Sequence, residues 1–209
     1  RPESWGFYQP QNIIDKYRFP ANLEESERYP NVDWDKALFR DFAPSYNANL
    51  NISGGSDFVK YFAGADFQYE GDLIREYDNG RGYHPGFGFN RLNVRTNLDF
   101  QLTNTTTLKV GLSGSYGVRK TPWNFGGGDY VYWIAAYTTP PDIYLPQYSD
   151  GSWGYNAPSG GGQGNAIRNL AISGVQYLTN TQLQTNFTLE QDLDMLIDGL
   201  SFNGTIALD

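Results

Sequence analysis

The chain has 209 residues and no cysteine, and its 23 acidic against 15 basic side chains give a formal charge of -8. The lack of cysteine excludes a disulfide framework and a cysteine-ligated metal, and the acidic balance argues against a nucleic-acid partner, which requires clustered Lys and Arg. Mean hydropathy is -0.55, and no apolar run approaches the roughly 18 residues of a membrane helix.

Residues 1–44 precede the first strand signal and are predicted to form a loop that leads into a sheet. Within them, Val32–Phe39 is predicted to form a helical turn, because Asn31 or Asp33 can cap its start. The two aromatic side chains of this turn are expected to anchor it rather than to bind a ligand.

Six stretches beyond residue 45 alternate apolar and polar side chains, which a strand sends to opposite faces. Phe62 is the single break in the second stretch. In the first stretch, Tyr46, Ala48, Leu50 and Ile52 alternate with Asn47, Asn49, Asn51 and Ser53. Spans of roughly 9 to 11 residues are what a tilted strand needs to cross hydrocarbon. The predicted strands cover residues 46–53, 60–70, 91–100, 108–119, about 175–193 and 200–208.

The connections between these stretches alternate in length. Residues 54–57, 101–106 and 194–199 are short and rich in turn residues, whereas residues 71–88 and 120–174 are long and rich in Gly, Pro and aromatic side chains. Because the long connections fall on every second link, they leave the sheet at one end, as the external loops of outer-membrane barrels do. A soluble antiparallel sheet with one wet face shows the same two-residue period and stays an alternative.

We therefore predict an all-β fold, an antiparallel segment of a large transmembrane β-barrel with extracellular loops at residues 1–44, 71–88 and 120–174. Six strands leave two edges whose exposed backbone groups cost several kcal/mol each in lipid, so they must pair with the remainder of the barrel. No signal peptide is visible at Arg1, and we expect an internal or processed piece of a longer protein. The inner face is predicted to carry mixed charges, from Asp66, Glu70, Arg91, Arg95, Asp99, Lys109 and Arg119.

The second long loop is the candidate ligand-binding region, because aromatic rings can face the C–H bonds of a sugar while nearby carboxylates and amides bond its hydroxyl groups. Residues 129–138 are predicted to form a short helix that starts at Asp129 and ends before Pro140. Packing of the loops, or an aromatic girdle at the membrane interface, is the alternative role for these rings. The candidate ligand-binding residues are Trp123, Phe125, Asp129, Tyr130, Trp133, Tyr144, Asp150, Trp153 and Tyr155.

Several motifs resemble the SusC/RagA family of TonB-dependent outer-membrane transporters, and the resemblance covers most of residues 29–209. They are the run YPNVDWDKALF at 29–39, SGGS at 53–56, YFAG at 61–64, YEG at 69–71, RLNVRTNLDF at 91–100, LSGSY at 112–116, the Pro140-Pro141 pair and IDGLS at 197–201.

The resemblance implies more than the spacing of residues does. It implies a barrel of about 22 strands with a plugged lumen in the bacterial outer membrane, a SusD-like surface lipoprotein as partner, and import of glycans or peptides driven by TonB through the plug. The plug and its TonB-contacting segment are not recognisable in these residues. The alternatives from other classes are a soluble all-β glycan-binding module and a passive porin.

No motif predicts an enzyme, a cofactor or a metal. His84 is the sole histidine and lies in a Gly-Tyr-His-Pro-Gly loop without a nucleophile elbow. Asp192, Asp194 and Asp198 have a loose calcium spacing but lack the Gly and Glu positions of an EF-hand loop. The glycines at 126–128 lack the Lys that follows in a phosphate-binding loop.

Overall fold

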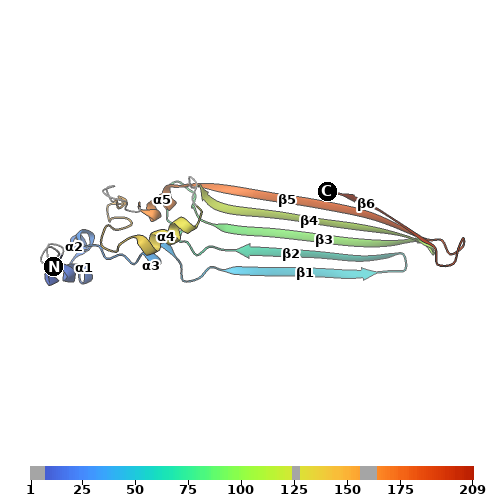
Figure 1. Cartoon of the computed structure of the whole chain (residues 1–209), viewed down its shortest axis with the longest axis horizontal. Coiled ribbons are helices and arrows are strands. Elements are labelled where there is room, and N and C mark those ends of the chain that lie inside the picture. Colours follow the sequence, from blue (N-terminus) through green and yellow to red (C-terminus); the bar gives the residue numbers. More distant parts are fainter. Residues whose placement is uncertain (1–7, 124–127, 156–163) are drawn as a thin grey trace. The chain divides into compact units, whose positions relative to one another are not determined.

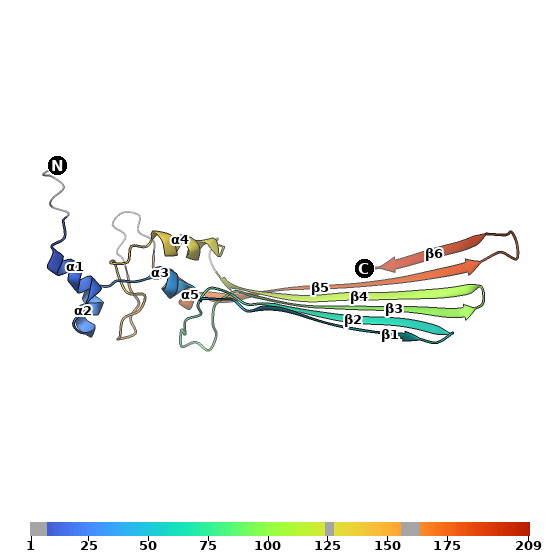
Figure 2. The same ribbon diagram turned by 90° about the horizontal axis from the view of Figure 1, so that it is seen from below.

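The structure is a computed structural model that describes residues 8–123, 128–155 and 164–209. The chain forms two compact units. The sheet unit is drawn from residues 43–72, 87–120 and 177–209, and the loop unit from residues 1–42, 73–86 and 121–176. Figures 1 and 2 show both units, which are described separately below.

The described residues contain one antiparallel sheet of six strands, in the order β1-β2-β3-β4-β5-β6. Each strand therefore pairs with its neighbours in sequence (Figure 1). The all-β prediction and its six strands are confirmed. The strands are β1 Ser45–Gly55, β2 Val59–Glu70, β3 Gly88–Thr103, β4 Thr106–Trp123, β5 Gly174–Asp192 and β6 Ser201–Leu208.

Two of the three tight turns are shorter than predicted, because turn-forming residues remain paired in the strands. The turn between β5 and β6 is slightly longer than predicted and covers residues 193–200. Gly54 and Gly55 pair with Tyr61 and Lys60, so the first turn is confined to residues 56–58. The second turn contains only residues 104 and 105, since pairing continues to Thr103. A register shift between Gln101 and Thr103 accommodates this pairing.

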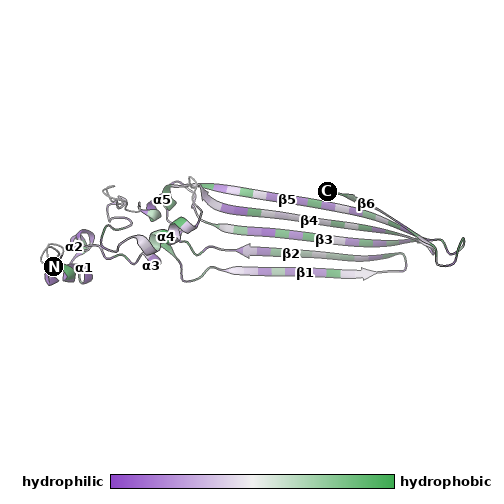
Figure 3. Cartoon of the chain, viewed as in Figure 1, coloured by the Kyte–Doolittle hydropathy of each residue, from purple (hydrophilic) through white to green (hydrophobic). Residues whose placement is uncertain are grey.

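The register places apolar and polar side chains on opposite faces of the sheet, because residues paired across neighbouring strands point to the same side. One row across β1 to β4 is Leu50, Ala65, Val94 and Gly114, and the next is Asn49, Asp66, Asn93 and Ser115. Figure 3 shows the hydropathy alternating along the strands. The alternation in the sequence therefore gives the folded sheet one apolar face and one polar face.

The loop unit contains five helices in the described residues. Asp33 caps α3 by accepting the Lys36 N–H, which confirms one of the two predicted caps, and α4 lies where a helix was expected. Three helices were not predicted: two lie within residues 8–44 and one within residues 164–174. The helices are α1 Gln11–Arg18, α2 Leu23–Arg28, α3 Trp34–Leu38, α4 Tyr130–Thr138 and α5 Ala166–Ile172. None of the helices in the described ranges has the length and apolar character needed to span a bilayer.

Hydrogen bonds and ring contacts join the three segments of the loop unit. Trp34 Nε1 donates to the Pro140 carbonyl at 3.1 Å. The Phe39 ring stacks on Trp133 with centroids 4.2 Å apart, and Phe39 also forms an antiparallel bridge with Ile74. The buried apolar side chains of this unit are Trp34, Leu38, Phe39, Ile74, Tyr132, Ala135, Tyr144, Ala166, Ile167, Leu170 and Ala171.

Candidate functional site

The polar face of the sheet carries a hollow of about 360 Å³ near its middle. Carboxamides and hydroxyls dominate its lining, with two guanidinium groups and one carboxylate among them. The lining side chains with polar groups are Asn49, Asn51, Asp66, Arg91, Asn93, Arg95, Ser113, Ser115, Gln182 and Gln184. The face therefore offers many hydrogen-bonding groups to water or to a polar molecule.

A short chain of hydrogen bonds orders the centre of the hollow. Arg91 Nε donates to Asn93 Oδ1 at 2.8 Å, and Asn93 Nδ2 donates to Asp66 Oδ1 at 3.0 Å. The amide of Asn93 therefore lies between a positive and a negative side chain and is oriented by both. Its three members come from β2 and β3, which the antiparallel register brings together.

Phe62, the break in the predicted alternation, has a structural explanation. Its row on the polar face contains Ser53, Asn97 and Gly111, and the Arg95 guanidinium lies 4.9 Å from the centre of its ring. A guanidinium over an aromatic face is attracted by the ring's negative surface. Phe62 thus lies on the polar face, where its ring packs against Arg95, and does not face lipid.

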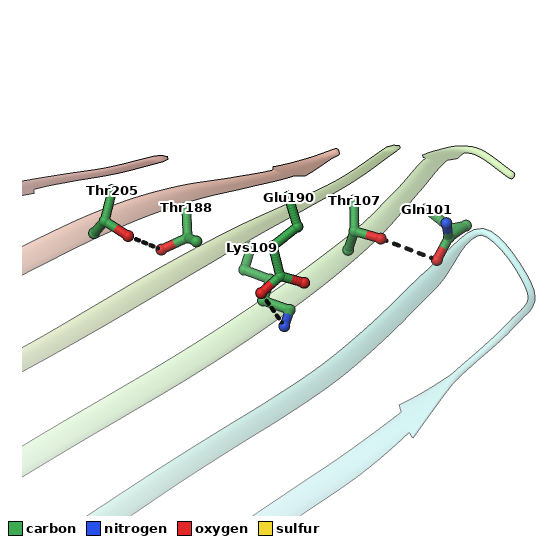
Figure 4. A network of polar contacts seen from close by, with 6 residues as sticks. All are labelled: Gln101, Thr107, Lys109, Thr188, Glu190 and Thr205. Carbon is green, nitrogen blue, oxygen red and sulfur yellow. Dashed lines mark hydrogen bonds and ion pairs between the residues drawn. The ribbon is translucent and has the colours of Figure 1, made fainter. Parts of the chain in front are cut away.

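Polar contacts continue across the face toward the tight turns, as Figure 4 shows. Lys109 on β4 pairs with Glu190 on β5 at 2.7 Å, and Lys109 lies opposite Asp99 on β3. The hydroxyls of Thr188 and Thr205 lie 2.9 Å apart. Because the row that contains Lys109 has charges of both signs, these charges largely compensate one another.

The opposite face exposes large apolar side chains in a continuous band. Leu50 is 73% exposed, and its neighbours in the band are also exposed, as in Ile52, Val94, Leu112, Tyr116, Leu183 and Ile206. Soluble proteins rarely expose contiguous apolar patches larger than a few hundred Å². This band is typical of the lipid-facing surface of a membrane barrel.

The predicted ligand-binding aromatics do not share one environment in the loop unit. Tyr144 is 1% exposed and packs edge-on against Trp34, and burial raises the pKa of its hydroxyl. It is a core residue of this unit. Trp133 is partly covered by its stacking on Phe39, whereas Tyr130 presents an exposed ring.

The remaining predicted residues are spread over other parts of the loop unit. Trp153 forms a bridge with Gln147, and Tyr155 is exposed. The Asp150 carboxylate accepts the Ser152 N–H at 2.8 Å, and hydrogen bonds from Ser152 lower its pKa. Asp129 precedes α4 but its side chain makes no cap hydrogen bond, and Phe125 lies outside the described residues.

A hollow of about 440 Å³ lies between α4 and α5. Of the predicted ligand-binding residues in the described ranges, Trp123 alone lines it. Asn169 and Ser173, which sequence reasoning did not single out, contribute polar groups. The helical spacing of Ala166, Ile167, Leu170 and Ala171 after the cap residue Asn165 is the signal that could have revealed α5 and this hollow.

The acidic turn between β5 and β6 uses its carboxylates to hold its own backbone. Asp194 accepts the Gly199 N–H at 2.7 Å, and Asp192 accepts the Asp194 N–H at 2.8 Å. The described residues contain no group of three or more His, Cys, Asp or Glu side chains placed to hold a metal ion.

Sequence comparison identifies a relative of this chain. It is 31% identical over 160 residues to TonB-dependent receptor P26 of Formosa agariphila, and the alignment covers 76% of the chain. The chain belongs to the TonB-dependent receptors. It spans 14% of the length of that relative. No family model matches it.

Solved structures share the fold of this segment. The RagAB peptide transporter matches 96% of the chain with a TM-score of 0.55 and 20% sequence identity. The RagAB peptide importer in its closed-closed state matches 96% with a TM-score of 0.57 and 18% identity. The segment covers 23% of the chain that it matches in each structure. The predicted barrel segment and the SusC/RagA resemblance are confirmed, and the relatives are a receptor and transporters rather than enzymes.

Proposed function

We propose that this segment forms part of the wall of a TonB-dependent transporter that imports glycans or peptides across the bacterial outer membrane. One observation carries the proposal: a single sheet has a continuous apolar face and a continuous polar face with a hollow. Such a sheet separates lipid from a water-filled lumen. The remainder of the barrel would pair with the edges of β1 and β6, since exposed backbone groups are costly in lipid.

In this proposal the loop unit lies on the extracellular side and helps to capture the ligand. Exposed rings such as Tyr130 and Tyr155 supply flat apolar surfaces, and Asp150 supplies a carboxylate for hydroxyl or ammonium groups. A SusD-like lipoprotein would cover the same side, and TonB would act through a plug in the lumen. Transport requires binding and displacement of the plug, without covalent chemistry.

The proposal is tested by uptake in cells that lack the full-length receptor and are complemented with it. A fluorescent peptide library and a fluorescent oligosaccharide library identify the ligand class. We expect the receptor to restore uptake of one class, and deletion of TonB to abolish it. Uptake that persists without TonB would identify a passive porin instead.

The proposed ligand-binding role of the loop aromatics has a matched control. Tyr130→Ala and Tyr155→Ala remove exposed rings of the candidate set, and Tyr8→Ala removes a similarly exposed ring outside it. We expect the first two substitutions to weaken ligand binding several-fold and the third to leave it unchanged. If all three variants bound the ligand with the same affinity, Tyr130 and Tyr155 would not belong to the binding site.

A further inference from the structure

The hollow on the polar face is positively charged although the whole chain is acidic. Arg91 and Arg95 line it with Asp66 as the one carboxylate, which leaves a formal charge of +1, whereas the 209 residues carry -8. The two arginines lie on one face of β3, about 13 Å apart along the strand at roughly 3.3 Å per residue. Asn93 lies between them and engages the carboxylate of Asp66.

Neither arginine has a carboxylate partner among the described residues. Ion pairs elsewhere in the described residues join Lys16 to Glu25, Lys36 to Asp33, Arg40 to Glu76 and Lys109 to Glu190. Arg91 uses its Nε for Asn93 and Arg95 lies over the Phe62 ring. Each contact orients one guanidinium group. The other N–H donors of that planar group remain able to bond a further acceptor.

The surroundings of the two guanidinium groups favour an anion with flat, two-oxygen geometry. Guanidinium and carboxylate form two parallel hydrogen bonds that are stronger than bonds between neutral groups. Neighbouring amides and hydroxyls, such as Asn51, Ser113 and Gln182, complete the hydrogen bonds of a bound chain without adding charge. The row that contains Lys109 differs, because its lysine already has Glu190.

We propose that this hollow is a carboxylate-binding site, in which Arg91 and Arg95 each hold an acidic group of a polypeptide in the lumen. The inference rests on the proposed function, because it requires the polar face to border the lumen. The carboxylate has two possible sources with the same chemistry. One is an Asp or Glu side chain of the same protein folded into the lumen, and the other is an acidic peptide ligand.

The test uses the full-length receptor with Arg91→Gln, Arg95→Gln and the double substitution. Arg119→Gln is the matched control, since Arg119 is exposed on the same face, in the row of Glu70 and Phe89, and does not line the hollow. Assembly of each variant is checked by the heat-dependent shift of the barrel on a gel. Arg91→Lys keeps the charge but loses the fork, and it replaces any variant that fails to assemble.

The first measurement is calorimetric titration with tetraglutamate, with tetraglutamine as the neutral probe. For a ligand-derived carboxylate, we expect the double variant to bind tetraglutamate at least about 10-fold more weakly, since charge-assisted bonds are lost, and to bind tetraglutamine as before. Arg119→Gln should behave as the wild type with both probes.

The second measurement is ion conductance through the receptor in a planar bilayer as urea is raised. For a carboxylate of the same protein, we expect the double variant to open at lower urea than the wild type and Arg119→Gln, because a bond that retains the lumen segment is missing. A double variant that matches Arg119→Gln in both measurements overturns the carboxylate site. The proposed function survives that outcome if TonB-dependent uptake persists, and it fails separately if the wild type shows no such uptake.

Discussion

Asn165 joins a helix and a hairpin of the loop unit through its side-chain amide. It is 5% exposed, and its Nδ2 donates to the carbonyls of Pro146 and Gly154 at 2.8 and 3.0 Å. Its Oδ1 accepts the Arg168 N–H and so caps α5. One buried amide thereby joins the start of a helix to both sides of the 146–154 hairpin.

We expect Asn165→Ala to destabilise the loop unit by about 1–3 kcal/mol, because it leaves buried carbonyls without donors and removes a helix cap. Faster hydrogen exchange across residues 146–154 and 165–172 would report the loss. Asn169→Ala is the control, since Asn169 is exposed on the same helix. Exchange rates that are equal in the two variants would contradict the role given to Asn165.

We expect the stability of α3 to depend on pH through Asp33. The N–H and the ammonium of Lys36 lower the pKa of its carboxyl. A carboxyl whose pKa is lower in the folded state contributes stability that is present above the unfolded pKa of about 3.9 and is lost as pH falls through the folded value.

We therefore expect exchange at the Ala37 N–H, which bonds to the Asp33 carbonyl in the first turn, to accelerate below about pH 4 beyond its intrinsic rate. Asp33→Asn keeps an acceptor oxygen without the charge and should remove the pH dependence. A wild type and variant with the same pH profile would show that Asp33 does not stabilise the turn through its charge.

At the scale of single elements, the strands were predictable from sequence and most helices were not. The apolar and polar side chains of a strand alternate every second residue, so the pattern is visible within each short stretch. The same pattern fixes which residues share a face. By contrast, α1 follows Pro10 without a side-chain cap, and α2 has only six residues. The carboxamides and charges of the polar face were predictable, but the contact between Arg95 and Phe62 was not. It joins neighbouring strands at positions 33 residues apart in the sequence, off the direct pairing of the register.

The register of β3 can be tested with two neighbouring substitutions. Val94 lies in the apolar row with Leu50 and Ala65, and Asn93 lies in the polar row with Asp66. Val94→Arg places a charge toward lipid, which costs roughly 2–4 kcal/mol near the midplane, whereas Asn93→Arg places it toward water. We expect a much lower yield of assembled receptor for Val94→Arg in the outer-membrane fraction, and similar yields would refute the register.

At the scale of the whole molecule, the proposed membrane orientation can be tested because these 209 residues contain no cysteine. Tyr137 on α4 is 77% exposed, and Met195 in the turn between β5 and β6 is 82% exposed. We expect a membrane-impermeant maleimide to label Tyr137→Cys on intact cells. Met195→Cys should react only after the outer membrane is permeabilised, and labelling of Met195→Cys on intact cells would reverse the orientation.

The loop unit is assembled from three stretches that are separated by strands in the sequence. The Arg75 Nε bonds to the Lys36 and Phe39 carbonyls at 2.8 and 2.7 Å, and the Asn79 amide bonds to the Ala171 carbonyl at 2.8 Å. Bringing these stretches together is entropically costly while the intervening chain is loose. Pairing of β1 to β4 brings these stretches closer together and so lowers the entropic cost. We therefore expect the native contacts of Arg75 and Asn79 to form last, after the neighbouring hairpins have paired.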